Sequence, residues 1–374
     1  MRITILQGPF FPVPPLRGGA VEKIWFQLGQ AFERQGCQVN QVSRLCDGLP
    51  DRETIEGVEH VRVPGFESNN SMLQRLWRDM RYVRRAARVL PEADILVTNT
   101  FFAPIMIRDR SRGAIYVNVA RYPKGQMKYY KRAARLQAPS RPIADAIRKE
   151  VPHLADKTIA LPNPLAWTPD AERSTANREK VILYLGRIHP EKGLRELVSA
   201  FASLDDQTRG EWRLEIRGPW RDEQGGAGGG FLEELRGIAK PVAGSVDFFD
   251  PIFEDEELKR ELRRASLFAY PSLAERGETF GLSALEAMSC GCPPLVSGLE
   301  CFGDFIADGE TGFVFDHRGE DVVTALAARM TELLAGPPEV LDQVGEAARK
   351  ASIPYAIDPV AKVYLEDFQR ILAE

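Results

Sequence analysis

Residues 181–201, VILYLGRIHPEKGLRELVSAF, join a strand to a helix. The run 181–185 is short, apolar and rich in branched side chains, which is typical of a buried strand, and apolar residues recur at helical spacing towards the end of the segment. The loop between them contains Arg187 and Lys192, and Gly193 lies immediately before the helix. Two cations at the carboxyl end of a strand, beside a helix N-terminus, suit a diphosphate. Two solvated loop cations are the simpler alternative.

Residues 275–297, ERGETFGLSALEAMSCGCPPLVS, predict a second junction between a loop and a helix. Glu278 and Glu286 lie eight positions apart, and Gly281 lies between them, just before a helix-like run at 283–289. The backbone N–H groups at a helix start bind phosphate well. Each glutamate could then reach a hydroxyl-rich group on one side of that phosphate, as a nucleotide-sugar presents. An ordinary surface helix with two solvated glutamates is the alternative.

Strand-like runs alternate with helical patterns along the whole chain. The strand-like runs are 2–6, 38–43, 58–63, 94–98 and 114–119 in the first half and 181–185, 213–217, 246–249, 267–270, 294–297 and 313–315 in the second. This alternation predicts an α/β fold in which parallel sheets have helices on both faces. The segment 162–164, Pro-Asn-Pro, and the polar stretch 169–180 indicate a hinge between two domains, 1–165 and 166–354. Neither half has GxGxxG after a strand, which argues against a dehydrogenase.

The two motifs together resemble the retaining glycosyltransferases of family 4, also called glycosyl transferases group 1. The matching positions are Gly186-Arg187, Lys192-Gly193, Glu278 and Glu286 with Phe280-Gly281-Leu282 between them, Gly18-Gly19, and Gly309-Glu310-Thr311-Gly312-Phe313. The resemblance is stronger over 180–320 than nearer the N-terminus. It implies the GT-B architecture, in which two Rossmann-like, doubly wound domains face a central cleft.

The resemblance also implies a donor site. It implies a UDP- or GDP-sugar donor, a hexosyltransferase-type enzyme that retains the anomeric configuration, and no metal or other cofactor. Arg187 and Lys192 would hold the donor diphosphate and stabilise the leaving group, Glu278 would bind the sugar hydroxyls, and Glu286 the ribose. We therefore expect Arg187, Lys192 and Glu278 to be catalytic. The implied donor-binding set is Gly18, Gly19, Arg187, Lys192, Glu278, Thr279, Phe280, Gly281, Leu282 and Glu286.

The same resemblance assigns a role to each domain. It implies an acceptor-binding domain at 1–165, a nucleotide-sugar-binding domain at 166–354, and a terminal helix within 355–374 that packs back on the first domain. Asn118 and Asn99 stand where members of the family often have histidines. Whether these two asparagines alter or remove activity stays open.

The composition fits an enzyme of the cytoplasm. No run approaches the roughly 18 apolar residues of a membrane span, and no signal segment opens the chain. Five cysteines and four scattered histidines show no metal spacing, so we expect reduced thiols and no metal site. Cys290 and Cys292 are interpreted as small-residue packing at a helix end rather than a metal or redox pair. The acidic run 254–257 looks like a helix start and not a metal-binding Asp-x-Asp.

Charge is divided unequally between the halves. Residues 1–165 contain 26 Lys and Arg against 15 Asp and Glu, whereas the remainder contains 23 against 38. Basic residues concentrate at 73–90 and 121–135, and the first stretch predicts an amphipathic helix that includes Trp77. Such a helix favours a peripheral membrane contact or an anionic acceptor, with a solvated helix face as the alternative.

No nucleic-acid-binding module is recognisable in the first half. We therefore expect no nucleic-acid partner. The basic first half and the resemblance imply a glycan, a lipid-linked or a small-molecule acceptor, and a role in cell-surface polysaccharide or lipopolysaccharide synthesis, in the cytoplasm and at the inner face of the membrane. Two other functions remain open, a nucleotide-sugar 2-epimerase that needs no acceptor and a non-catalytic protein that binds nucleotide-sugars or membrane surfaces. Residues 224–230, QGGAGGG, predict a mobile loop, which is either a lid over the nucleotide or an ordinary surface loop.

Overall fold

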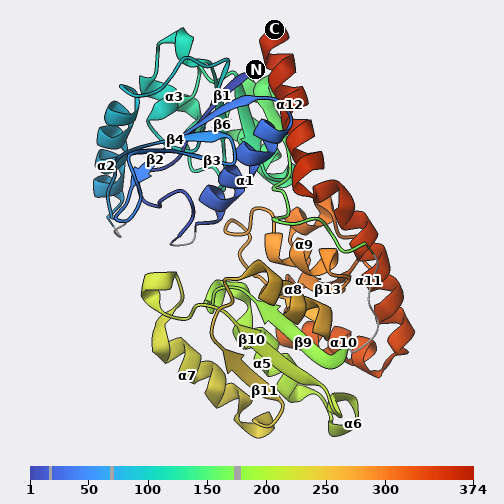
Figure 1. Ribbon diagram of the computed structural model, residues 1–374. Coiled ribbons are helices and arrows are strands. Elements are labelled where there is room, and N and C mark those ends of the chain that lie inside the picture. Colours follow the sequence, from blue (N-terminus) through green and yellow to red (C-terminus); the bar gives the residue numbers. More distant parts are fainter. Residues whose placement is uncertain (17–18, 68–70, 172–177) are drawn as a thin grey trace. The chain divides into compact units, whose positions relative to one another are not determined.

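The computed structural model describes residues 1–16, 19–67, 71–171 and 178–374, and these form two compact units (Figure 1). Unit 1 comprises Met1–Ala166 together with Tyr355–Glu374, and unit 2 comprises Trp167–Pro354. The stretch that the sequence indicates as a hinge, 169–180, lies partly outside the described residues. Each unit is described by itself.

Unit 1 contains a sheet with the strand order β3-β4-β2-β1-β5-β6-β7-β8, in which every neighbouring pair is parallel except β3 and β4. Its strands are β1 (Arg2–Leu6), β2 (Gln38–Leu45), β3 (Arg52–Ile55), β4 (Val58–Pro64), β5 (Ile95–Thr98), β6 (Ala114–Asn118), β7 (Arg135–Ala138) and β8 (Thr158–Ala160). Its helices are α1 (Ala20–Arg34), α2 (Met72–Ala86), α3 (Ala103–Met106), α4 (Arg141–Glu150) and α12 (Ile357–Ala373).

Alternating side chains of the unit 1 strands enter separate cores. Ile5 packs in the core that contains α1 and α12, whereas the next residue, Leu6, packs in the core that contains α2 and α3. In the first core, the rings of Phe32 and Phe368 lie 5.6 Å apart, and α12 runs beside α1 (Figure 1). The last helix of the chain therefore belongs to the core of the unit in which the chain begins.

Unit 2 contains an all-parallel sheet with the order β11-β10-β9-β12-β13-β14. Its strands are β9 (Glu179–Leu185), β10 (Arg213–Arg217), β11 (Val246–Phe249), β12 (Ala265–Tyr270), β13 (Pro294–Ser297) and β14 (Phe313–Phe315). Its helices are α5 (Leu194–Ser203), α6 (Asp206–Arg209), α7 (Gly228–Ala239), α8 (Asp255–Arg264), α9 (Leu282–Ser289), α10 (Val322–Ala335) and α11 (Pro338–Ser352). Parallel strands with connecting helices place the carboxyl ends of all six strands at one edge, where α/β proteins bind ligands.

Every expected strand is present, and the described residues contain three more. The sequence did not predict β3, β7 and β8. Each of these strands has only three or four residues, and each contains polar residues such as Arg or Thr beside few apolar ones. The expectation of a shapeless loop at 224–230 is wrong for Gly228, Gly229 and Gly230, which form the first turn of α7. Apolar side chains farther along α7 are buried against unit 2, which outweighs the poor helix propensity of glycine.

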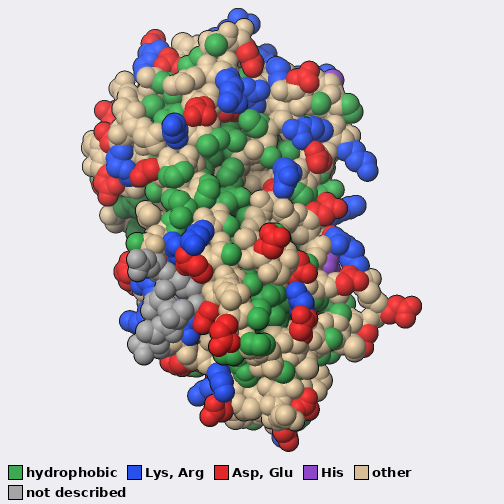
Figure 2. Space-filling view, turned by 90° about the vertical axis from the view of Figure 1, so that its right-hand side faces the viewer, with side chains coloured by type: hydrophobic (Ala, Val, Ile, Leu, Met, Phe, Trp, Pro, Cys, Tyr) green, Lys and Arg blue, Asp and Glu red, His purple; other side chains and the backbone are tan. Residues whose placement is uncertain are grey.

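The first basic stretch, 73–90, forms α2. The helix ends at Ala86, four residues before the end of that stretch. On the face drawn in Figure 2, basic and acidic side chains are interspersed, so the excess of basic residues in the first half does not produce a uniformly positive surface there. Among the described helices, none is long and apolar enough to cross a membrane.

Candidate functional site

The loop between β9 and α5 places two cations at the carboxyl edge of unit 2. Arg187 follows β9, and Lys192 ends a short 3-10 turn just before α5. Gly193 has φ 70°, and a Cβ atom there would lie 2.0 Å from the carbonyl oxygen of Pro271, which follows β12. Only glycine permits this approach, so the loop is pressed directly against the backbone of the adjacent strand end.

Lys192 and Glu278 meet there, although 86 positions separate them in the sequence. Lys192 Nζ lies 2.7 Å from Glu278 Oε2, and the two side chains are only 8% and 11% exposed. Tyr270 donates a hydrogen bond of 3.0 Å to the same oxygen, and its ring centre lies 5.3 Å from Nζ. A buried cation requires an anionic partner. Glu278 supplies this partner.

Arg187 is more accessible than Lys192, with a side chain that is 44% exposed. Its guanidinium donates to Glu191 Oε1 at 2.7 Å and to the carbonyl oxygen of Gly225 at 2.9 Å. The two cations of the motif are thus each held by a carboxylate. An exposed pair such as Arg187 with Glu191 exchanges readily for a stronger anion.

The second motif forms the expected helix start. Gly281 has φ 84° and caps α9, and a Cβ atom at this position would lie 2.3 Å from the Phe302 ring. The first backbone N–H groups of α9 follow Gly281, and Phe280 is buried beside them. Glu286 is half-buried on the second turn of α9, and Thr279 is half-buried just before Phe280. The structure therefore brings Lys192, Glu278 and the start of α9 to one edge of unit 2.

The expected glycine pair falls in the sequence of unit 1, whereas the other residues of the expected donor-binding set belong to unit 2. Gly18 lies outside the described residues. Gly19 has φ 101° and precedes α1, and a Cβ atom there would lie 2.5 Å from Glu22 Oε2. Burial raises the pKa of Glu22, a residue that the sequence does not single out. Asn118 is buried and donates a 2.6 Å hydrogen bond to Gln137, while Asn99 is half-buried.

The cysteines of unit 2 pack as small apolar residues. Cys290, Cys292 and Cys301 are all buried and none forms a disulfide, and burial raises the pKa of the Cys290 thiol to about 12. Cys292 Sγ lies 3.4 Å from the carbonyl oxygen of Ala265, in β12. Within the described ranges, no three His, Cys, Asp or Glu side chains gather as metal ligands would.

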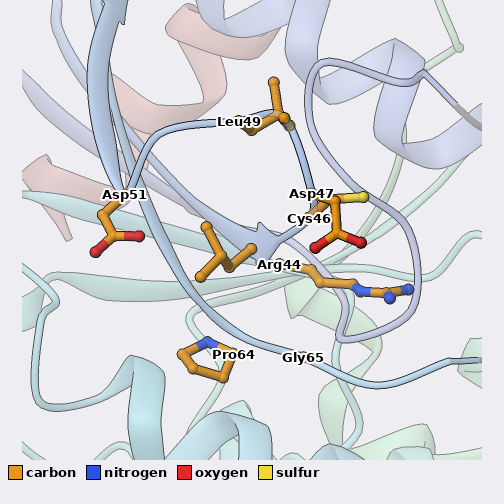
Figure 3. Close-up of a pocket in the computed structure, with 9 residues that line it drawn as sticks. Arg44, Cys46, Asp47, Leu49, Asp51, Pro64 and Gly65 are labelled. Atoms are coloured by element: carbon orange, nitrogen blue, oxygen red, sulfur yellow. The ribbon is translucent and has the colours of Figure 1, made fainter.

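A pocket of about 380 Å³ opens at the carboxyl ends of β2 and β4 in unit 1 (Figure 3). Its lining residues are Arg44, Leu45, Cys46, Asp47, Gly48, Leu49, Asp51, Pro64 and Gly65. The Arg44 guanidinium is nearly buried, where it pairs with Glu67 and donates a 2.7 Å hydrogen bond to the Phe10 carbonyl oxygen. This pocket could not be predicted from the sequence, because its walls come from the loops that follow two different strands.

Comparisons with known proteins agree on the class of protein. Residues 168–351 match the family described as glycosyl transferases group 1. A D-inositol 3-phosphate glycosyltransferase of Rhodococcus opacus is 34% identical over 190 residues, which are 49% of this chain and 40% of that protein. An O-antigen chain mannosyltransferase B of Escherichia coli is 32% identical over 147 residues, or 38% of this chain and 34% of that protein. The chain spans about two fifths or less of the length of these curated relatives.

The solved structures extend the likeness to both units. A sucrose-phosphate synthase from Thermosynechococcus elongatus superposes with a TM-score of 0.79 at 20% identity, over 100% of this chain and 99% of that one. At this identity the likeness concerns the fold alone. It confirms the fold class expected from the sequence, two α/β domains of the GT-B type.

Proposed function

The chain belongs to the glycosyl transferases of group 1, and we propose that it transfers a hexose from a nucleoside diphosphate sugar to an acceptor, with retention of the anomeric configuration. The observation that carries the proposal is the pair of the buried Lys192 with the largely buried Glu278, 2.7 Å apart at the carboxyl edge of unit 2. A cation and a carboxylate side by side match the two parts of such a donor, its diphosphate and its sugar hydroxyls.

The remaining donor contacts are proposed from the resemblance to the family, and the local geometry supports them. Lys192 and the accessible Arg187 would stabilise the charge that develops on the diphosphate when the bond to the sugar breaks. The N–H groups at Phe280, Gly281 and Leu282 would add to this anion site. Glu278 would accept hydrogen bonds from sugar hydroxyls, and the reaction would proceed without a metal ion. Glu286, within α9, is proposed to bind the ribose.

We propose that the acceptor binds to unit 1. Its basic composition suits an anionic or lipid-linked acceptor, and the pocket beside Arg44 and Asp47 offers polar groups to hydroxyls. Names among the relatives support both a small phosphorylated polyol and a cell-surface glycan as the class. The α2 helix exposes Met72, Leu73 and Trp77 among its arginines, which supports a peripheral contact with the inner face of a membrane.

Thermal unfolding with a panel of UDP, GDP, ADP, CMP and dTDP, each with matched sugar donors, tests the donor site. A nucleotide present at a hundred times its dissociation constant should stabilise the protein by about 2.7 kcal/mol. Arg187→Ala should abolish this shift and lower transfer by about 10²- to 10³-fold. Its own unfolding temperature should stay close to the wild-type value, because an exposed ion pair contributes at most about 1 kcal/mol.

Arg213→Ala is the matched control, because this exposed arginine begins β10 at the opposite edge of the sheet and pairs with Asp247. It should leave both binding and transfer unchanged. Full activity in Arg187→Ala would refute the assignment of the site. Conversion of the donor without an acceptor would indicate the epimerase, and tight binding without transfer or hydrolysis would indicate a non-catalytic binding protein.

A further inference from the structure

Two tyrosines from adjacent strands lie beneath the proposed donor site. Tyr184 is the second-last residue of β9 and Tyr270 the last residue of β12. Their rings stack with centroids 5.8 Å apart and an interplanar angle of 10°. Both residues are buried, so each phenol hydroxyl requires a hydrogen-bond partner inside the protein.

The two hydroxyls reach different halves of the site. Tyr184 donates a 2.9 Å hydrogen bond to the carbonyl oxygen of Arg187, in the loop that carries both cations. Tyr270 donates a 3.0 Å hydrogen bond to Glu278 Oε2. Burial raises the pKa of both phenols well above the usual value, so both remain protonated and act as donors.

The bond from Tyr270 determines which oxygen of Glu278 is available. Oε2 already accepts from Lys192 and from Tyr270, whereas Oε1 has no hydrogen-bond partner among the described residues. A sugar hydroxyl would therefore meet Oε1. When a diphosphate attracts Lys192, the bond from Tyr270 still orients the carboxylate.

The surroundings hold both rings in place. A Cβ atom on Gly186 would lie 2.7 Å from the Tyr184 hydroxyl, which explains the glycine that ends the strand in the first motif. Tyr270 stacks on Phe268 at 6.1 Å and meets the edge of Phe302 at 6.1 Å. The Phe302 ring in turn packs against Gly281, so the aromatic layer connects both motifs.

We propose that Tyr184 and Tyr270 are positioning residues of the donor site, Tyr184 for the diphosphate through the Arg187 loop and Tyr270 for the sugar through Glu278. This inference rests on the proposed function. It predicts that the Tyr184 hydroxyl affects binding of the diphosphate and the Tyr270 hydroxyl affects binding of the sugar. Two core tyrosines with a purely structural role would not differ in this way.

Tyr184→Phe and Tyr270→Phe test the inference, because each keeps the ring and removes only the hydroxyl. Calorimetric titration would compare the bare nucleoside diphosphate that stabilises the wild type with its sugar-bearing form. Tyr184→Phe should weaken binding of both ligands by roughly tenfold. Tyr270→Phe should bind the bare diphosphate within about threefold of wild type and weaken the sugar-bearing ligand by roughly tenfold or more, because a hydrogen bond to a carboxylate is lost.

A double-mutant cycle with Glu278→Gln shows whether Tyr270 acts through that carboxylate. In the Glu278→Gln background, Tyr270→Phe should produce little further loss of sugar-bearing donor affinity. Tyr82→Phe is the control, because its hydroxyl is buried in unit 1 and has no partner among the described residues. It should leave both affinities unchanged.

The outcomes separate this inference from the proposed function. No binding of any nucleoside diphosphate by the wild type would overturn the proposed function. Wild-type binding together with unchanged affinities in both phenylalanine variants would overturn the role of the tyrosines alone. If a variant does not fold, 3-fluorotyrosine at position 270 keeps the hydroxyl. Its ¹⁹F signal should then move more with the sugar-bearing ligand than with the bare diphosphate, and equal shifts would overturn the inference.

Discussion

The first strand of each unit leads to its first helix through a glycine with positive φ, yet the two junctions are built differently. In unit 2, Gly193 ends a loop of eight residues whose backbone is pressed against Pro271. In unit 1, Gly19 ends a longer, proline-rich loop and faces the flexible carboxylate of Glu22. The short junction holds Lys192 beside Glu278, whereas the long one meets only side chains at its glycine. The same local architecture is thus packed against fixed backbone in unit 2 and against side chains, which can move, in unit 1.

Substituting alanine for each glycine should separate the two junctions most strongly. Gly193→Ala should destabilise the protein by at least about 3 kcal/mol, because positive-φ strain is added to a clash with a backbone carbonyl. Gly19→Ala should cost only the strain, about 1–2 kcal/mol, because the Glu22 side chain can move aside. Chemical denaturation of both variants measures the difference.

Gly309→Ala measures the cost of the positive φ alone, because Gly309 has φ 76° and no atom lies within 4 Å of the added Cβ. It should match Gly19→Ala. Equal destabilisation by all three substitutions would mean that the close approach to Pro271 is relaxed at little cost, and the contrast between the junctions would not hold.

Buried ionisable groups also differ between the units. Unit 2 pairs its buried Lys192 with Glu278, whereas unit 1 buries His60 with both ring nitrogens unpartnered among the described residues. Burial lowers the pKa of His60 to about 4 and raises the pKa of Asp79 to about 6. As the pH falls, the unfolded state binds a proton at His60 before the folded state does. The stability that His60 contributes is therefore full above about pH 6.5 and is lost as the pH falls towards 4. The contribution of Asp79 to stability depends on pH in the opposite direction, and it is lost as the pH rises from about 4 to 6.

Two variants should therefore change the acid sensitivity in opposite directions. His60→Phe should reduce the loss of unfolding free energy between pH 7 and pH 5 by up to about 2 kcal/mol, and Asp79→Asn should increase it by about 1 kcal/mol. Hydrogen exchange of the backbone amides of β2 and β4, close to His60, measures the unfolding free energy of unit 1 directly. Parallel pH profiles for the wild type and His60→Phe would show that His60 is not buried as a neutral ring.

The sequence predicted most of the fold because the strands of both units are either apolar runs, as in β9, or alternate apolar with polar residues, as in β4 and β10. It failed for β7, RLQA, and β8, TIA, where so few residues give no periodicity. The candidate site was predicted only in part. Arg187, Lys192 and Glu278 stand out as charges next to glycines at strand and helix ends.

Their partners could not be predicted from the sequence. Tyr184 and Tyr270 look like ordinary strand residues, because nothing local shows where a phenol hydroxyl points. The pairing of Lys192 with Glu278 depends on β9 and β12 being neighbours, which the spacing along the chain does not reveal. Long-range contacts of this kind are determined by sheet order, and the sequence pattern indicates the class of fold but not the order of the strands.

The smallest expected effect concerns the surfaces of the two units. Leu73, at the start of α2, is 80% exposed beside the arginines of that helix, and Val340 on α11 is 41% exposed on the acidic unit. Leu73→Ser should weaken sedimentation of the protein with vesicles that contain phosphatidylglycerol by about three- to tenfold, because an inserted leucine gains up to the transfer energy of one apolar side chain. Val340→Ser should leave this binding unchanged, and neither variant should alter stability beyond about 0.5 kcal/mol. Binding that is lost in 0.5 M salt but unaffected by Leu73→Ser would place the attraction in the arginines alone, since salt of this concentration screens exposed charges and leaves apolar insertion intact.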